Sequence, residues 1–161
     1  MSRVMPGRFT AETNESFVVF LIGMRINKFF AFNKWVPTAM AMTPMLQTLY
    51  EHPDKGFLGG ESFLYWRGAG LIQYWRSFED LERFARSPEE PHLKAWQRFN
   101  RVVGADGSVG IWHETYLINP GNYEAIYGNM PIFGLAAATK HVPMTGRKET
   151  ARQRVGNGYG A

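Results

Sequence analysis

The apolar positions along the chain fall into two repeats of the same order of elements. Residues 16–26, "SFVVFLIGMRI", are rich in β-branched and aromatic side chains, which predicts a buried strand. Residues 33–52 carry apolar side chains at spacings of three and four, which predicts a helix with Pro44 as a candidate breaking point. Residues 56–77 predict two strands that meet in a hairpin near Gly68-Ala69-Gly70.

The second half of the chain repeats this order. Ser77 and Asp80 have the spacing of a helix N-terminus, which predicts a helix over 77–87. Helical spacing resumes over 92–104, and residues 108–118, "SVGIWHETYLI", predict a strand. A shorter strand is expected over 122–130. Two β–α–β units in this order predict an α+β fold of the ferredoxin-like type, a split βαβ arrangement with an antiparallel sheet and helices on one face.

The other face of such a sheet needs a cover. The predicted strands are dense in aromatic residues, which suits a second copy packed face to face, so we expect a homodimer of the dimeric α/β-barrel type. The alternative is a lone sheet with the C-terminal segment folded over it. We expect an N-terminal arm over 1–15, a ferredoxin-like domain over 16–140 and a basic, flexible tail over 141–161. Residues from about 145 onward are predicted to be dispensable for folding.

Composition and charge exclude several classes of protein. The chain has 161 residues, 45% of them hydrophobic, and no cysteine, which excludes disulfides, thiolate metal sites and cysteine nucleophiles. The net charge of +4 lies in the tail, because residues 1–139 hold 13 basic and 13 acidic side chains. We therefore expect no nucleic-acid partner. The longest apolar run has eight residues, against about 20 for a membrane span. We expect a cytoplasmic protein without a membrane partner or a signal peptide.

Two histidines and a group of methionines are the candidates for chemistry. His113 shares a strand face with Ile111 and Thr115, so it is expected to point toward the helices, either as a core histidine or as a ligand or catalytic group. His92 opens a helix after an acidic stretch and is either a surface residue or an acid–base group. The methionines are core filler or the lining of a pocket for a flat ligand: Met24, Met40, Met42 and Met45.

Several segments of the chain resemble one known family. They are "FVVFLIGMRIN", "QYWRSFEDLERFAR", "PHLKAW", "GIWHETY" and "NMPIFGLAAAT", within about residues 16–145. Together they resemble a bacterial and fungal family of monooxygenase-like proteins of unknown function, which belongs with the dimeric α/β-barrel proteins. The resemblance implies the ferredoxin-like fold. It does not determine the chemistry, because one fold serves many functions.

A second resemblance concerns the stretch "IWHETYLINPGNYEAIYGNMP". It is similar to the C-terminal part of the haem-dependent aldoxime dehydratases, which implies that His113 is the axial ligand of a haem b iron. The family's distal catalytic histidine has no counterpart here, because its position falls at Met130, which is expected to be a site residue on the other side of the pocket from His113. Acid–base work would then need His92 or a water. The remaining candidates for the haem site are Leu93 and Trp96 for the apolar slot, and Arg25, Arg67 and Arg76 for the propionates.

Three functional hypotheses follow from these observations. The first is a homodimeric enzyme that binds haem and acts oxidatively, or as a dehydratase, on a small organic substrate. The second is a monooxygenase without a cofactor, in which an electron-rich substrate itself activates oxygen. The third is a ligand-binding dimer without catalytic activity.

Overall fold

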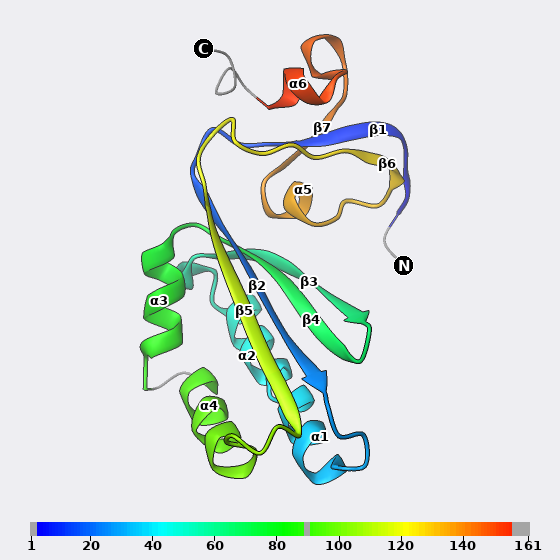
Figure 1. Cartoon of the computed structure of the whole chain (residues 1–161). Helices are drawn as coiled ribbons and strands as arrows, with labels where there is room; N and C mark the ends of the chain where they lie inside the picture. Colours follow the sequence, from blue (N-terminus) through cyan, green and yellow to red (C-terminus); the bar gives the residue numbers. More distant parts are fainter. Residues whose placement is uncertain (1–2, 89–90, 156–161) are drawn as a thin grey trace.

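The main sheet of the molecule has four strands in the order β3-β4-β2-β5, with every neighbouring pair antiparallel (Figure 1). The computed structural model describes residues 3–88 and 91–155. Hydrogen bonding is continuous along the central pair, from Val18 opposite Trp75 to Arg25 opposite Gly68. The strands are β2 (Phe17–Ile26), β3 (Phe57–Tyr65), β4 (Gly68–Trp75) and β5 (Val109–Ile118).

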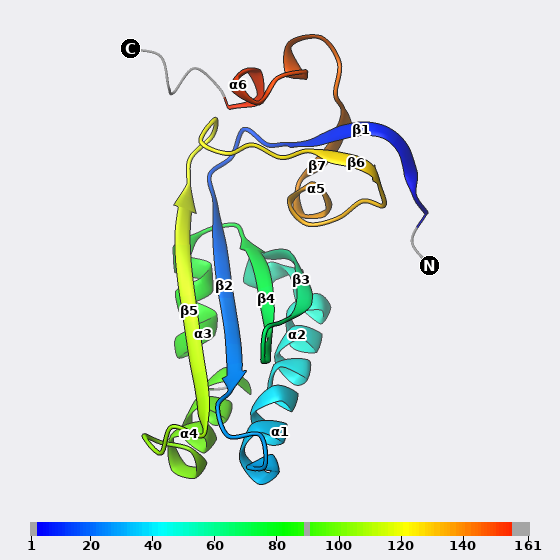
Figure 2. The ribbon, with the colours of Figure 1, turned by 45° about the vertical axis from the view of Figure 1, so that its right-hand side comes forward.

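Helices cover one face of this sheet (Figure 2). The order of elements is β2-α1-α2-β3-β4-α3-α4-β5, with a short 3₁₀ turn over Pro53–Lys55 before β3. This is the split βαβ order with antiparallel neighbours, so the predicted ferredoxin-like α+β fold is confirmed. The helices are α1 (Phe32–Met40), α2 (Met42–Glu51), α3 (Phe78–Arg86) and α4 (Pro91–Val102).

The long helix expected over 33–52 is divided in two at Ala41. The Ala41 N–H donates to the carbonyl of Thr38 at 3.3 Å, which is the shorter loop of a 3₁₀ turn. Pro44 stands in the first turn of α2 and has no N–H to continue the ladder of α1. The break therefore lies three residues before the proline that causes it.

The β3–β4 hairpin turns at Trp66 and Arg67, two residues before the predicted Gly68-Ala69-Gly70. Trp66 has φ +42°, which a two-residue turn between twisted strands requires. Gly68 already belongs to β4 and is needed for close packing. A Cβ on Gly68 would lie 1.8 Å from the carbonyl oxygen of Met24, so only glycine fits.

The main core lies between the sheet and the helices. Trp75 of β4 is fully buried, and Val18 of β2 and Leu49 of α2 pack in the same cluster. Ser77 caps α3 by accepting the N–H of Asp80 at 3.1 Å, as the sequence predicts. A second cluster at the far end of β2 contains Met24, and it anchors the last turn of α4.

A second sheet of three strands stands at one end of the main sheet (Figure 1). Its order is β6-β1-β7, with β1 over Met5–Glu12, β6 over Tyr127–Met130 and β7 over Lys140–Pro143. The structure differs here from the expected arm over 1–15, because Met5–Glu12 is the central strand of this sheet. A single polar strand carries no periodic signal of its own, and its partners lie more than 100 residues away in the chain.

The short helix α5 (Leu135–Ala138) lies against the end of the helix-free face of the main sheet. Its first N–H groups have partners in the strands. The Gly134 N–H donates to Glu61 Oε1 at 3.2 Å, and the Ala136 N–H donates to the Tyr127 hydroxyl at 3.3 Å. Burial raises the pKa of the neighbouring Tyr74 to about 12. The upper part of this face is therefore covered by the chain itself.

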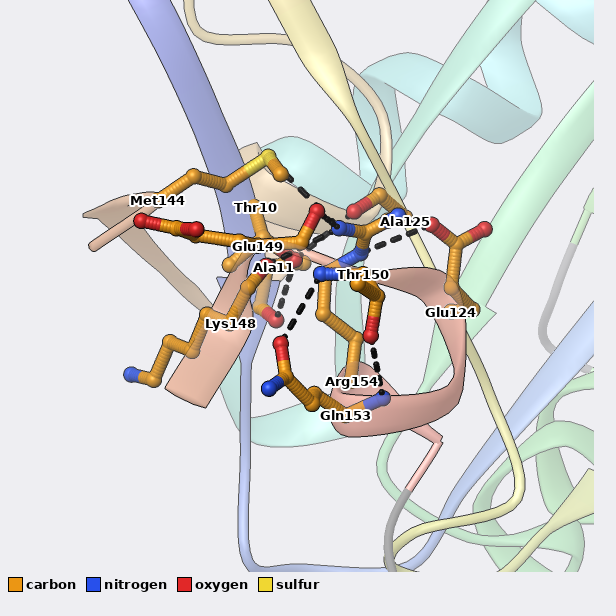
Figure 3. Close-up of polar contacts among 10 residues, drawn as sticks. All are labelled: Thr10, Ala11, Glu124, Ala125, Met144, Lys148, Glu149, Thr150, Gln153 and Arg154. Carbon is orange, nitrogen blue, oxygen red and sulfur yellow. Dashed lines mark hydrogen bonds and ion pairs between the residues drawn. The ribbon is translucent and has the colours of Figure 1, made fainter. Parts of the chain in front are cut away.

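The last described residues pack on the small sheet (Figure 3). They form a 3₁₀ turn over Gly146–Lys148 and helix α6 over Ala151–Arg154. The Arg154 guanidinium binds Glu124, with Nε to Oε1 at 2.8 Å, and the carbonyl of Lys148 at 2.9 Å. Lys148 also pairs with Glu12 at 2.7 Å. The basic tail therefore makes specific contacts, while its dispensability for folding stays a prediction.

Candidate functional site

A cavity of about 220 Å³ lies between the helix pair α1–α2 and the helix-covered face of the main sheet. Strands β2, β3, β4 and β5 supply its floor, and the two helices supply its roof. The floor consists of Ile22, Gly23, Met24, Ser62, Ala69, Gly70, Leu71 and Ile111, and the roof of Thr38, Ala39, Met42, Thr43 and Leu46.

The break at Ala41 determines the shape of this roof. Thr38 and Met42 both line the cavity although they belong to different helices, because the chain turns between them. The Thr38 hydroxyl donates to the carbonyl of Lys34 at 2.9 Å, a bond that bends helices. On the floor, alternate residues of β2 face the helices, which brings Ile22 and Met24 into the cavity.

The cavity is electrically neutral. None of the described residues that line it is ionisable, and its polar groups are the hydroxyls of Thr38, Thr43 and Ser62. The soft thioethers of Met24 and Met42 adapt to the shape of an apolar ligand. The volume lies below the usual range of about 300–1,000 Å³ for ligand pockets, so the site suits a small, uncharged molecule.

The predicted methionine lining is thus divided by the fold. Met24 and Met42 line the cavity. Met45 is buried in the main core, and Met40 is 64% exposed on the outer side of α1. Sequence spacing alone does not separate these roles, because all four lie on elements that pack against the same core.

His113 points to the helix side of the sheet, as its strand position predicts. It pairs with Ile22 of β2, and its ring centroid lies 5.6 Å from that of Phe20, a residue of the main core. The side chain is exposed at this edge strand and does not line the cavity, although its partner Ile22 does. The axial-ligand role of His113 stays a prediction.

The predicted cations for haem propionates do not gather around His113. Arg25 pairs with Gly110 and faces the helix-free side, where its guanidinium lies 4.1 Å from the centre of the Trp66 ring. Arg67 donates to the carbonyl of Asn27 at 3.3 Å in the hairpin turn.

Arg76 is engaged elsewhere, at the start of α3. Its Nε donates to Asp80 Oδ2 at 2.7 Å, and this hydrogen bond holds the pKa of the buried Asp80 carboxyl below its usual range. Arg83 binds the other oxygen of the same carboxylate at 2.9 Å. Arg76 therefore stabilises the start of α3 through its contact with Asp80.

The other members of the predicted haem site are also dispersed. Trp96 of α4 stacks on Phe99 at 5.7 Å and is 46% exposed, and Leu93 is half-buried one turn earlier. His92 belongs to α4, but its side chain lies outside the described residues. Met130 lies opposite Met5 in the small sheet, which packs on the helix-free side, so the fold does not bring it to His113.

The positions of these residues show whether they surround one site that could hold haem. His113 is exposed on the helix side of β5, and the predicted slot, cations and distal residue do not surround it. Among the described residues, no group of three or more His, Asp or Glu side chains is arranged to hold a metal ion. The haem site expected from the sequence is therefore not assembled around His113 in this fold.

Sequence reasoning missed most of the cavity. Ile22, Leu71 and Ile111 lie on apolar strands and read as ordinary core residues. The available signal was Pro44 inside an apolar, uncharged helical run, because a broken helix leaves space against the sheet that it covers.

Among the described residues, no helix is long and apolar enough to cross a bilayer.

The fold and the sequence together define the class of this protein. Residues 17–135 match the model of the monooxygenase af470-like family, and the chain belongs to that family. The curated relative named monooxygenase af470, from Aspergillus fumigatus (strain ATCC MYA-4609 / CBS 101355 / FGSC A1100 / Af293), is 31% identical over 120 residues. That match covers 70% of this chain and 41% of the relative, so the chain spans about two fifths of its length.

Two solved structures share the fold. An aldoxime dehydratase (OxdRE) in complex with butyraldoxime superposes with a TM-score of 0.65 at 15% identity, over 92% of this chain and 40% of that one. A second aldoxime dehydratase gives a TM-score of 0.60 at 18% identity, over 80% of this chain and 39% of that one. At these identities the likeness extends to the fold alone.

Proposed function

We propose that this chain acts as a monooxygenase on a small, uncharged organic molecule, and that it does so without a bound cofactor. The observation that carries the proposal is the neutral cavity between α1–α2 and the sheet, which offers apolar and thioether contacts, three hydroxyls and no ionisable lining residue among those described. Membership of the monooxygenase af470-like family supports the reaction class.

The chemistry suits a substrate that supplies its own electrons. In an electron-rich aromatic compound with an enolisable CH₂, that carbon is oxidised by O₂ to a carbonyl. One oxygen atom enters the substrate, and the other leaves as water with the two hydrogens of the CH₂. The protein then has to hold the substrate in one orientation and exclude bulk water. Thr38, Thr43 and Ser62 are the groups that orient a polar substituent.

Oxygen consumption tests this proposal. The purified chain is mixed with a panel of enolisable aromatic substrates, and oxygen uptake is followed with an electrode. Ala69→Leu fills the floor of the cavity and is expected to lower the rate at least tenfold, with little change in the unfolding midpoint. Ala137→Leu adds the same atoms to an exposed alanine of α5, away from the cavity, and is the matched control. Equal rates in wild type and Ala69→Leu would contradict the proposal.

Haem binding at His113 is the second candidate, and one observation favours it. The imidazole is exposed on the helix side, beside Phe20, where an apolar ring can approach it. Haem is titrated into wild type, His113→Ala and His92→Ala, and the Soret band is recorded. A shift that disappears in His113→Ala alone, with oxygen uptake that depends on haem, would favour this candidate over the first.

We also propose that the partner of the chain is a second copy bound through the helix-free face. Tyr116 of β5 is 47% exposed there, and Phe63, Tyr65 and Trp112 are partly exposed beside it on the same face. α5 covers the upper end of this face, so the remaining aromatic surface is what a second sheet would bury. Light scattering at micromolar concentration distinguishes the dimer from the monomer.

A further inference from the structure

The corner between β2 and α1 carries a dense group of exposed apolar side chains. Phe30 is 86% exposed, Met40 64% and Phe29 54%, and Phe32 and Val36 lie beside them at 46% and 38%. We call these five residues the α1 corner. Both ribbon views place α1 and the loop that leads into it at the end of the molecule away from the small sheet (Figures 1 and 2). Exposed apolar groups of this size mark interaction sites in globular proteins.

The aromatic side chains of the α1 corner hold one another in place. The ring of Phe29 makes edge contacts with Phe30 at 5.7 Å and with Phe32 at 5.5 Å between centroids. The Trp35 indole N–H donates to the Phe29 carbonyl at 2.8 Å, which ties the loop to α1. The loop thus presents its phenyl rings outward in a fixed arrangement.

The charge around the α1 corner is positive. No acidic residue occurs between positions 25 and 50, whereas Arg25, Lys28 and Lys34 lie in that stretch. Arg25 and Arg67 both bond to Asn27, directly before this loop. Among the described residues, the Asp106 carboxylate reaches this stretch from outside and pairs with Lys34. Lys28 donates to the Asp106 carbonyl, so its charge is not neutralised by that contact.

We propose that the α1 corner docks on the surface of an anionic lipid bilayer. Phenyl rings flanked by basic side chains are suited to the boundary between acyl chains and acidic headgroups. A convex loop with exposed rings can enter a bilayer, and docking of this kind needs no spanning helix. The expectation of no membrane partner came from the lack of such a span, so it does not bear on surface docking.

A second copy is the competing occupant, and the fold argues against it. The proposed dimer uses the helix-free face, whereas Val36 and Met40 lie on α1, in the layer that covers the opposite face. Pairing of the sheets therefore leaves the outer side of α1 uncovered. The same helix supplies Thr38 and Ala39 to the cavity. Docking would bring the cavity close to the membrane, which gives an apolar substrate a short route; this last point rests on the proposed function.

Vesicle flotation tests the docking directly. The full chain is mixed with phosphatidylcholine vesicles, with or without phosphatidylserine, and the bound fraction is measured. We expect binding to the phosphatidylserine vesicles that weakens as salt is raised. The double variant Phe30→Ser/Phe32→Ser is expected to bind at least tenfold more weakly. Leu117→Ser removes an apolar side chain that is 67% exposed on β5 and should leave binding unchanged.

Each other outcome overturns the proposal. Absence of binding by the wild type does so, as does equal binding by the double variant. If light scattering shows that Phe30→Ser/Phe32→Ser abolishes self-association while no variant binds vesicles, the α1 corner is an interface between copies. Circular dichroism of the double variant confirms folding. Oxygen uptake is measured separately, so loss of the proposed activity and loss of docking are distinguishable.

Discussion

The two faces of the main sheet use the same strands but are built in different ways. On the helix-covered face, large side chains such as Trp75 are buried against residues of α2 and α3. On the helix-free face, aromatic rings lie over glycines on the neighbouring strand. A Cβ on Gly23 would lie 2.7 Å from the Trp112 indole, and one on Gly70 would lie 2.6 Å from the Phe63 ring. The first face is packed under helices except at the cavity and along the exposed edge strand β5, whereas the second leaves flat aromatic surface partly exposed.

The covers of the two faces also differ. The helix side is filled by apolar packing, and its main polar anchor is Asp80 between two arginines. On the other side α5 is held by backbone hydrogen bonds to Glu61 and Tyr127. Loss of side-chain volume destabilises a closely packed apolar core, whereas the stability of a half-covered face depends on the surface that packs on it. The following predictions test this difference, beginning with the largest effect.

Removal of an aromatic ring should cost far more on the helix-covered face. Trp75→Ala empties a fully buried site and is expected to destabilise the fold by about 3–5 kcal/mol. Trp112→Ala, on the partly exposed face, should cost about 1 kcal/mol in the monomer. Urea unfolding followed by circular dichroism measures both. Equal losses in the two variants would show that the helix-free face is as tightly packed as the core.

Close approach of strands should matter at Gly68 and not at Gly128. In Gly68→Ala the new methyl group meets the Met24 carbonyl, so β2 and β4 must separate, at a cost of about 1–3 kcal/mol. In Gly128→Ala the methyl group meets no atom within 4 Å, and stability should change by less than about 0.5 kcal/mol. Thermal unfolding compares the pair. A neutral Gly68→Ala would mean that the hairpin end is not packed as described.

Adjacent residues of β5 test which face forms the dimer. Tyr116 and Leu117 point to opposite sides of the sheet and are both exposed. Tyr116→Asp places a charge on the helix-free face and should weaken self-association about tenfold or more. Leu117→Asp carries the same charge on the other face and should associate like the wild type. Analytical ultracentrifugation gives both dissociation constants, and the opposite ranking would place the interface on the helix side.

The anchor of α3 should appear in the pH dependence of stability. Arg76 lowers the pKa of Asp80, so this carboxylate stabilises the fold above its ordinary pKa, and that contribution is lost as the pH falls through the lowered value. The unfolding midpoint of Asp80→Asn should therefore be reduced near neutral pH and approach the wild-type value in acid. Glu82→Gln breaks an exposed pair with Arg86 and is the control. A parallel shift at every pH would contradict the role of the charge.

The smallest effect is expected at the tail. The sequence predicts that removal of residues from about 145 onward leaves folding intact, yet Arg154 has a mostly buried side chain bound to Glu124 (Figure 3). We expect truncation before Gly146 to lower stability by about 1 kcal/mol through these lost contacts. Arg154→Ala separates this bond from the rest of the segment. An unchanged unfolding midpoint in both would confirm the prediction of a dispensable tail.

Much of the fold could be predicted because its signals are local. The apolar, β-branched runs of residues 16–26 and 108–118 mark β2 and the edge strand β5, and Ser77 marks the start of α3. The hairpin turn was placed two residues too late, because the glycines of 68–70 serve close strand packing and the turn itself is made by Trp66. Turn residues and packing glycines have the same composition, so only the register distinguishes them.

The candidate site was harder to predict because it is made by several elements at once. His113 was correctly expected to face the helices, since alternation along a strand determines that direction. The same alternation predicts that Arg25 points to the helix-free face. Whether Arg25 and Arg76 lie near one site depends on how the whole sheet is built. The cavity needed the α1–α2 break, which no single residue of its floor reveals.

The sequence by itself determined the order of strands and helices over residues 16–118 and the face of the sheet to which His113 points. Those properties depend on neighbours within one or two turns, which periodicity records directly. The tertiary structure alone decided that β1 pairs with β6 and β7, that the predicted haem cations lie apart, and that a neutral cavity opens under α1–α2. Such features arise from contacts between residues far apart in the chain, whose energies depend on how the elements pack together and leave no repeating pattern in the sequence.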